Sequence, residues 1–195
     1  MLDILKKNAD ELCRLMPQLY PLGQTLSSAA DVVAAALFRG NKILTCGNGG
    51  SASDASHLTT EFVSRFDRER RPYPAISLCV HGGDLTAIGN DYDFQDIFAR
   101  QVAAFGKPQD VLVVLSTSGK SENVRRALIE AKSHGVITIA LLGRGGGNCA
   151  GIADFELLTP GVTTARIQEL QQILIHSLCE MVEDSLELSR GNESQ

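Results

Sequence analysis

Tryptophan, net positive charge and long apolar runs are all missing from this sequence. Aromatic residues are only 5% of its 195 residues. A formal net charge of −5 and a pI of about 5.4 argue against nucleic-acid binding through bulk charge. The one basic cluster, at 65–71 (RFDRERR), is interrupted by two acidic residues and is interpreted as a solvated loop rather than an anion site. No stretch reaches the ~20 apolar residues that spanning a bilayer requires, so no membrane contact is expected.

Paired cysteines and a targeting segment are also lacking. The five cysteines are odd in number and show no CxxC spacing, which favours reduced, buried thiols over disulfides. The first residues, MLDILKKNADEL, do not form a basic head followed by an apolar run, so no secretory signal is predicted. The cytoplasm is therefore the expected compartment.

The composition that remains fits one globular domain over residues 1–195. Hydrophobic residues are 44% and charged residues 21% of the chain, as in an ordinary folded domain. Within residues 1–39, apolar positions recur at spacings of three and four, which predicts N-terminal helices with a break at 21–23. Their apolar surface suits packing and oligomerisation. A sheet-and-helix core is expected over 40–188, followed by a polar tail over 189–195.

Short apolar runs alternate with helical patterns through the core. The strands are expected at 42–46, 75–80, 111–115, 137–142 and 155–158. Helical patterns occupy 51–66, 84–104, 121–134 and about 163–188. The central runs are almost continuously apolar, as parallel strands covered on both faces must be. The pattern therefore predicts a three-layer α/β fold with an open parallel sheet.

Two strand ends carry the same chemistry. The first expected strand ends in Gly47-Asn48-Gly49-Gly50-Ser51, and the third in Ser116-Thr117-Ser118-Gly119-Lys120-Ser121. Each loop leads directly into a helix, whose free N–H groups and positive dipole end favour an anion. Glycine allows close approach of the backbone, and hydroxyls donate hydrogen bonds. Together these features favour a phosphate group at the carboxyl ends of the strands.

The alternative interpretation of each loop is a plain strand-to-helix turn capped by serine. Neither loop matches the nucleotide-binding patterns GxxxxGK[ST] or GxGxxG, so a nucleotide is not indicated. A third glycine-rich loop, at 143–147 (GRGGG), is interpreted either as a segment that closes over a ligand or as a flexible surface turn.

Few side chains are available for proton transfer or metal binding. His57 and Glu61 are four residues apart on one helix, a spacing that suits a divalent metal, an acid–base pair or an ordinary helix surface. Gln168, Gln172 and His176 share a face of the last helix. Two further histidines, His81 and His134, show no partner in the sequence and are interpreted as structural or surface residues.

Spacing limits how the last helix can contribute. Gln168 and His176 are eight residues apart, which is about 12 Å along a helix. Both side chains would be stretched to their limits to reach one metal from the same helix. If both serve active sites, these sites are expected where helices of different subunits meet.

Four motifs together closely resemble the phosphoheptose isomerase family of SIS (sugar isomerase) proteins. They are CGNGGSASDASHLTTEF (46–62), LTAIGNDYDF (85–94), LSTSGKSENV (115–124) and ARIQELQQILIH (165–176). The similarity runs from the N-terminal helices to about Glu187. It implies a flavodoxin-like, five-stranded parallel sheet, a homotetramer and active sites shared between subunits. The implied reaction converts D-sedoheptulose 7-phosphate into D-glycero-D-manno-heptose 7-phosphate, which feeds lipopolysaccharide heptose biosynthesis.

The resemblance also implies roles for single residues. The catalytic Glu and His of the family fall on Glu61, as the base, and His176, as the acid of an enediol step. The implied metal is one Zn²⁺ per subunit, with ligands at His57, Glu61, Gln168 and His176. Gln168 also falls among the substrate-binding positions, which are otherwise Asn48, Gly49, Ser51, Asp91, Ser116, Thr117, Ser118 and Ser121.

Two positions depart from the family pattern. Lys120 stands where many members have Asn, and Ala165 replaces an acidic residue seen in some members. Neither departure affects the catalytic pair, although Lys120 adds a positive charge near the expected phosphate site.

Other functions are compatible with this fold class. One branch of the family is a non-catalytic tetramer that binds the replication initiator DnaA, but that branch lacks the glutamate corresponding to Glu61. A regulatory SIS module that senses a sugar phosphate is a second alternative, although such modules are usually joined to a DNA-binding domain. An isomerase for another sugar phosphate, such as a hexulose phosphate, is a third.

Overall fold

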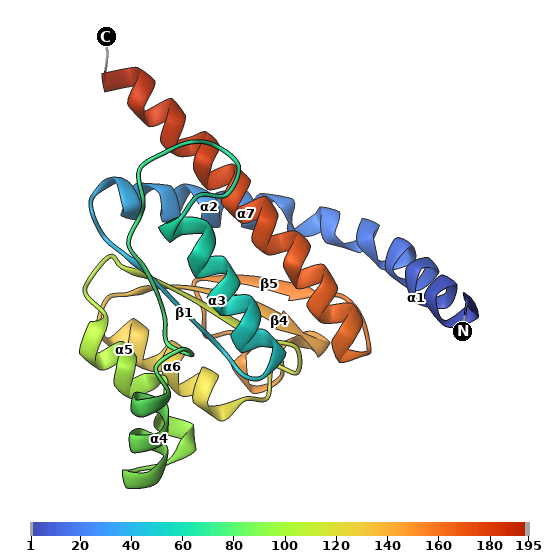
Figure 1. Cartoon of the computed structure of the whole chain (residues 1–195), viewed down its shortest axis with the longest axis horizontal. Helices are drawn as coiled ribbons and strands as arrows, with labels where there is room; N and C mark the ends of the chain where they lie inside the picture. The colour runs from blue at the N-terminus through green and yellow to red at the C-terminus, as the bar shows by residue number, and fades with distance from the viewer. Residues whose placement is uncertain (1, 194–195) are drawn as a thin grey trace.

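Five parallel strands run through the centre of the molecule in the order β2-β1-β3-β4-β5 (Figure 1). The computed structural model describes residues 2–193, with side chains described for residues 3–187. Every neighbouring pair of strands is parallel. The predicted flavodoxin-like parallel sheet is thus confirmed. The strands are β1 (Ile43–Gly47), β2 (Ala75–Ser77), β3 (Val111–Ser116), β4 (Ile137–Gly143) and β5 (Phe155–Thr159).

Helices cover both faces of the sheet. On one face lie α2 (Gly23–Phe38), α3 (Gly50–Val63) and α7 (Thr164–Glu193), and on the other α4 (Gly82–Asp91), α5 (Ala99–Phe105) and α6 (Glu122–Ser133). Alternate residues of β3 enter different cores: Val113 packs beneath α2, α3 and α7, whereas Val114 packs beneath α5 and α6. Burial on both faces explains why the sequence of β3 is continuously apolar.

The N-terminal helices behave differently from one another. α1 (Leu2–Leu15) projects away from the body of the molecule, whereas α2 packs along α7 (Figure 1). A 3₁₀ segment, η1 (Met16–Leu22), separates them, so the predicted break is longer than 21–23. Arg166 Nη1 donates to the carbonyl of Asn8 on α1 at 2.7 Å, and Leu12 and Leu15 at the end of α1 pack against the core.

The helical pattern predicted over 84–104 is divided into separate helices. The segment forms α4, a 3₁₀ turn η2 (Phe94–Asp96) and α5. The side chain of Asp93 accepts a hydrogen bond from the N–H of Gln95 at 2.8 Å, which starts a new turn two residues after α4 ends. Apolar periodicity cannot detect such a local cap, because the cap depends on one polar side chain and not on burial.

The interpretation of residues 65–71 as a solvated loop is also wrong for Arg70. Its side chain is 6% exposed and lies 2.8 Å from the carboxylate of Glu183 on α7. Arg68 pairs at the surface with Asp184 and Glu187. The loop between α3 and β2 is therefore anchored to α7, although charge composition alone suggested exposure.

α7 continues to Glu193, beyond the end predicted near residue 188. The last two residues of the predicted tail, 194–195, lie outside the described part of the chain. Within residues 2–193, no helix has the length and apolar content that crossing a membrane requires.

Candidate active site

α3 and α7 face each other over successive turns and bring together His57, Glu61 and His176 of the predicted site. Near the start of both helices, a Cβ added to Gly50 would lie 2.7 Å from the amide atoms of Gln168. One turn on, Gln172 Nε2 donates to Asp54 Oδ1 at 2.7 Å. One further turn on, the rings of His57 and His176 lie 5.3 Å apart in an edge-to-face arrangement. Successive turns of the two helices therefore pair in order along this face.

Glu61 lies one turn beyond His57 on the same face of α3. Its Oε1 is 2.7 Å from His57 Nε2, and the two side chains are 17% and 40% exposed. The ring of Phe66 lies 5.6 Å from that of His176. His57, Glu61 and His176 thus form one partly exposed cluster. A carboxylate and two imidazoles within reach of each other can accept and donate protons at a bound substrate.

The negative charge of Glu61 also affects a neighbouring thiol on α7. Burial raises the pKa of Cys179 to about 12, and the charges of Glu61 and Glu183 add to this rise. All five cysteines of the chain are free thiols, and Cys46, Cys149 and Cys179 are buried. The predicted reduced, mostly buried thiols are confirmed, except that Cys13 is exposed.

The first glycine loop is shaped by close backbone contacts. Gly49 has φ of 57°, and a Cβ on Gly47 would lie 2.6 Å from the carbonyl oxygen of Ser51. Asn48 points toward α6, where its amide and that of Asn123 exchange hydrogen bonds of 2.9 and 3.0 Å. This reciprocal pair joins the first loop to the helix that follows the second loop.

The second loop is built from its own hydroxyl groups. Ser116 Oγ accepts a hydrogen bond from the N–H of Gly119 at 3.0 Å and lies 3.4 Å from Ser121 Oγ. Ser118 Oγ accepts from the N–H of Lys120 at 3.2 Å, and Lys120 itself is exposed. Thr117 lies between these serines and is partly exposed.

Neither loop is a serine-capped turn. Ser121 precedes α6 and Gly49 precedes α3, and neither N-cap residue makes a side-chain capping hydrogen bond. The alternative interpretation of the loops as Ser-capped turns is therefore wrong. In the first loop the N–H groups of Ser51 and Ala52 donate to the carbonyls of Asn48 and Gly49 at 3.0 Å.

The third glycine loop supports the second one. It forms a 3₁₀ segment, η3 (Arg144–Cys149), in which Gly145, Gly146 and Gly147 all have positive φ. A Cβ on Gly119 would lie 2.1 Å from the carbonyl oxygen of Gly146, and the N–H of Cys149 donates to Gly119 at 3.0 Å. Because it packs this tightly against the serine loop, the segment is neither a free flap nor an unattached surface turn.

Asp91 is not brought to the other predicted site residues within one chain. It is exposed at the end of α4, on the face of the sheet opposite α3 and α7, and accepts a hydrogen bond from Asn90 at 2.7 Å.

The two histidines that were predicted to be structural or surface residues also lie outside this cluster. His81 precedes α4, and His134 ends α6, where Nδ1 lies 3.4 Å from Glu130 Oε1 and so has a partner after all.

The predicted zinc ligands only partly come together. His57, Glu61 and His176 are neighbours, and two imidazoles with a carboxylate are donors that suit zinc. Gln168 instead lies against Gly50, two turns away from His176. Within residues 3–187, no group of three or more His, Cys, Asp and Glu side chains is arranged to hold a metal ion. The four residues of a single chain therefore do not fit one zinc ion.

Several residues at the site were missed in the sequence. Asn123, Asp54, Arg70 and Glu183 are each nearly or largely buried and each contacts a site element. One oxygen of Asp54 has no hydrogen-bond partner. From sequence alone, a polar side chain is expected to be exposed unless its hydrogen-bond partner is known. These residues were missed because their partners are 75 or more residues away in the chain.

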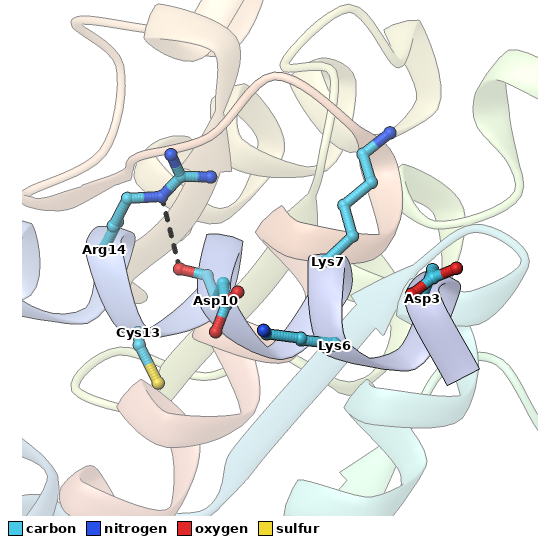
Figure 2. Close-up of a pocket in the computed structure, with 6 residues that line it drawn as sticks. All are labelled: Asp3, Lys6, Lys7, Asp10, Cys13 and Arg14. Atoms are coloured by element: carbon cyan, nitrogen blue, oxygen red, sulfur yellow. Dashed lines mark hydrogen bonds between the residues drawn. The ribbon is translucent and has the colours of Figure 1, made fainter.

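A separate hollow lies along α1 and contains none of these residues. Figure 2 shows its lining side chains along the projecting helix, with one hydrogen bond from Arg14 Nε to the carbonyl of Asp10 at 3.3 Å. The charges of both signs and the single lining helix do not resemble a substrate pocket. The residues that line it are Asp3, Lys6, Lys7, Asp10, Cys13 and Arg14.

Comparison with known proteins agrees with this geometry. Residues 10–143 match the family model described as the SIS domain, so the chain is a SIS-domain protein. The phosphoheptose isomerase of Aquifex aeolicus is 50% identical over 83% of this chain and 84% of its own length. The structure of the phosphoheptose isomerase of Neisseria gonorrhoeae is similar with a TM-score of 0.88 and 37% identity, covering 94% of this chain and 98% of that one. The corresponding enzyme of Francisella tularensis gives a TM-score of 0.90, 36% identity and the same coverage. The chain belongs to the phosphoheptose isomerase family.

Proposed function

We propose that this protein is an aldose–ketose isomerase that interconverts D-sedoheptulose 7-phosphate and D-glycero-D-manno-heptose 7-phosphate. The observation that carries the proposal is the cluster of Glu61, His57 and His176 on helices that begin beside two anion-type loops. α3 starts in the first loop and presents His57 and Glu61 two and three turns later. A phosphate held at the loops would leave the other end of the sugar near the acid–base cluster.

The roles proposed for Glu61 and His176 follow from the chemistry of moving a carbonyl between C1 and C2. The Glu61 carboxylate removes a proton from C1 of the ketose, and the electron pair forms the C1=C2 double bond. The C2 oxygen takes a proton from His176, which gives the enediol. His176 then takes back the proton of the C1 hydroxyl, and Glu61 returns its proton to C2, which produces the aldose and restores both groups. His57 holds the base in place through its 2.7 Å contact with Glu61.

Substrate binding is proposed for both loops. The hydroxyls of Ser116, Thr117, Ser118 and Ser121, with the N–H groups that start α6, would bind the phosphate. Asn48, Gly49 and Ser51 would contact the sugar from the first loop. Gln168, which touches Gly50, and Asp91 complete the proposed set of contacts, and Asp91 would have to come from another subunit.

We propose a homotetramer with active sites shared between subunits. Exposed apolar side chains on the projecting α1 and an apolar groove beside α2 and α7 support an assembly of this kind. Zinc binding is retained as a proposal only for a site assembled from two subunits, in which Gln168 of one subunit joins ligands of another. Metal analysis of purified protein and of a Gln168→Ala variant tests it. Equal zinc contents in the two proteins would contradict the shared set.

The remaining proposals concern the cellular location, the pathway and the alternative function. A cytoplasmic location is supported by five free thiols, which persist in reducing compartments. A place in lipopolysaccharide heptose synthesis follows from the proposed product. The DnaA-binding alternative is not favoured, because Glu61 is present and in contact with His57.

The test is turnover of sedoheptulose 7-phosphate, followed by NMR detection of the aldose phosphate. We expect wild-type protein to be active, and Glu61→Gln and His176→Ala to lose at least about 100-fold in kcat, in the range expected for an acid or base. Circular dichroism and molar mass serve as controls for folding and assembly. Absence of wild-type turnover, with zinc added or removed, would sink the assignment for this substrate.

A further inference from the structure

The loop between α3 and β2 is fastened to α7 by a single carboxylate. Glu183 accepts hydrogen bonds from the N–H groups of Phe66 and Asp67 at 3.3 Å and of Arg68 at 3.1 Å. It also accepts one from Arg70 Nε at 2.8 Å. The Glu183 side chain is only 4% exposed, so these four donors replace the water it would otherwise bind. Glu183 lies two turns after His176 on the same helix.

The guanidinium of Arg70 connects this carboxylate to the end of α3. Its Nη2 donates to the backbone carbonyl of Glu61, and its Nη1 donates to that of Phe62 at 3.0 Å. Carbonyl groups in the last turn of a helix have no partner within the helix. Arg70 therefore caps α3 at the residue proposed as the catalytic base.

The same network reaches the proposed catalytic acid. Phe66, whose N–H is bound by Glu183, places its ring 5.6 Å from the ring of His176. One buried carboxylate thus fixes the backbone of Phe66 against His176 and, through Arg70, the backbone of Glu61. Glu61 and His176, which are proposed to act on the same substrate, are therefore both positioned by the network of Glu183 and Arg70.

The charges of this support are stable in the folded protein. Burial raises the pKa of the Glu183 carboxyl, but the bonds from Arg68, Arg70, Asp67 and Phe66 outweigh it, so the pKa lies below its ordinary value. Removing one partner of such a buried pair leaves an unpaired charge in the interior, whereas an exposed pair contributes little. The neighbouring pair of Arg68 with Asp184 is exposed and provides a natural comparison.

We propose that Arg70 and Glu183 are positioning residues that hold Glu61 and His176 in register for proton transfer. The inference rests on the isomerase function proposed above. Neither residue contacts the serine loop, so their loss should change the catalytic step and leave phosphate binding largely intact.

Kinetics of four proteins test the proposal. Arg70→Ala is expected to lower kcat by about 10- to 100-fold, because small displacements of reacting groups have effects of this size, while KM changes less than about twofold. Arg70→Lys should recover part of the loss, since it restores the charge but not the fork to both carbonyls. Arg68→Ala, in the same loop, should match wild type. Guanidinium added at millimolar concentration should raise the kcat of Arg70→Ala and leave Arg68→Ala unchanged.

A second readout does not depend on activity. In protein with ¹³C-labelled histidine rings, Arg70→Ala and Glu183→Ala should shift the signals of His57 and His176 but not those of His81 and His134. Arg68→Ala should shift none of them. Unmoved His57 and His176 signals in folded Arg70→Ala protein would overturn the positioning proposal, even if no substrate is turned over. If the signals move in Arg70→Ala but the wild-type protein turns over no substrate, the isomerase assignment fails and the positioning proposal stands.

Discussion

Gly119 and Gly145 both have a positive φ, but only Gly119 lies against another loop. Their φ values are 62° and 72°. A Cβ at Gly119 would lie 2.1 Å from the carbonyl oxygen of Gly146, whereas a Cβ at Gly145 would meet no atom within 4 Å. Substitutions at the two positions therefore distinguish two destabilising effects: a side chain in a left-handed backbone conformation, and a steric clash of the new Cβ with the neighbouring loop.

We expect Gly145→Ala to lower the free energy of unfolding by about 1 kcal/mol, from the left-handed conformation alone. Gly119→Ala should lower it by a further ~1–3 kcal/mol, because the serine loop and η3 must move apart. Urea denaturation of the two variants and wild type measures both quantities. Equal losses in the two variants would mean that the loops can separate freely, and that η3 does not support the serine loop.

At the scale of elements, Asp110 joins the starts of β1 and β3. Its carboxylate accepts hydrogen bonds from the N–H groups of Lys42 at 3.0 Å and Lys107 at 2.9 Å, and from the amide of Asn41 at 3.2 Å. It also forms an ion pair with the Lys42 ammonium. Burial raises the pKa of Asp110, but these bonds lower it by more than burial raises it. The pKa of Asp110 therefore lies below its ordinary value.

A carboxyl group whose pKa is lowered by folding stabilises the protein above its unfolded pKa, and this contribution is lost as pH falls through the folded pKa. We therefore expect Asp110→Asn to lower the free energy of unfolding by about 1–3 kcal/mol at pH 7. The difference from wild type should shrink below about pH 4, where the unfolded carboxyl becomes protonated. Urea denaturation at both pH values checks this, and a difference independent of pH would contradict it.

The strands were the elements best predicted from the sequence. Burial on both faces favours apolar side chains at most positions, so β3 and β4 stand out as nearly continuous apolar runs. The division of 84–104 into α4, η2 and α5 was missed, since it depends on one aspartate side chain. Arg70 was misjudged for a related reason: whether an arginine is buried depends on its partner, here Glu183, 113 residues away.

The site was predictable in its parts but not in its arrangement. The motifs indicated His57, Glu61 and His176, and the spacing of Gln168 from His176 correctly separated those two along α7. The pairing of α3 with α7 could not be predicted, because it depends on which helices cover the same face of the sheet. The exposed position of Asp91 could not be predicted either, since α4 is held by the opposite core.

At the scale of the whole molecule, exposed apolar side chains occur on several elements, and two of them are adjacent on α1. Ile4 and Leu5 on α1 are 64% and 70% exposed, an unusual exposure for adjacent branched side chains on a helix that leaves the body of the molecule (Figure 1). A separate apolar groove lies between η1, α2 and α7. It is lined by Met16, Leu19, Tyr20, Gly23, Leu26, Ile173, Leu174, Ser177 and Met181.

A second copy of this chain is the occupant that we propose for these surfaces. Ile4→Asp combined with Leu5→Asp should therefore convert the proposed tetramer into smaller species, since two charges would be buried at a contact between subunits. Light scattering coupled to gel filtration measures the molar mass. Because Asp91 and Gln168 are proposed to act across subunits, turnover should fall with the tetramer fraction and recover at high protein concentration.

The exposed lysines of α1 offer a matched control for this prediction. Lys6→Ala and Lys7→Ala remove polar side chains of the same helix and should leave both mass and turnover unchanged. An Ile4→Asp, Leu5→Asp protein that remains tetrameric would show that α1 does not mediate assembly. A monomer with full turnover would show that one chain holds a complete site, and the proposed roles of Asp91 and Gln168 across subunits would then be wrong.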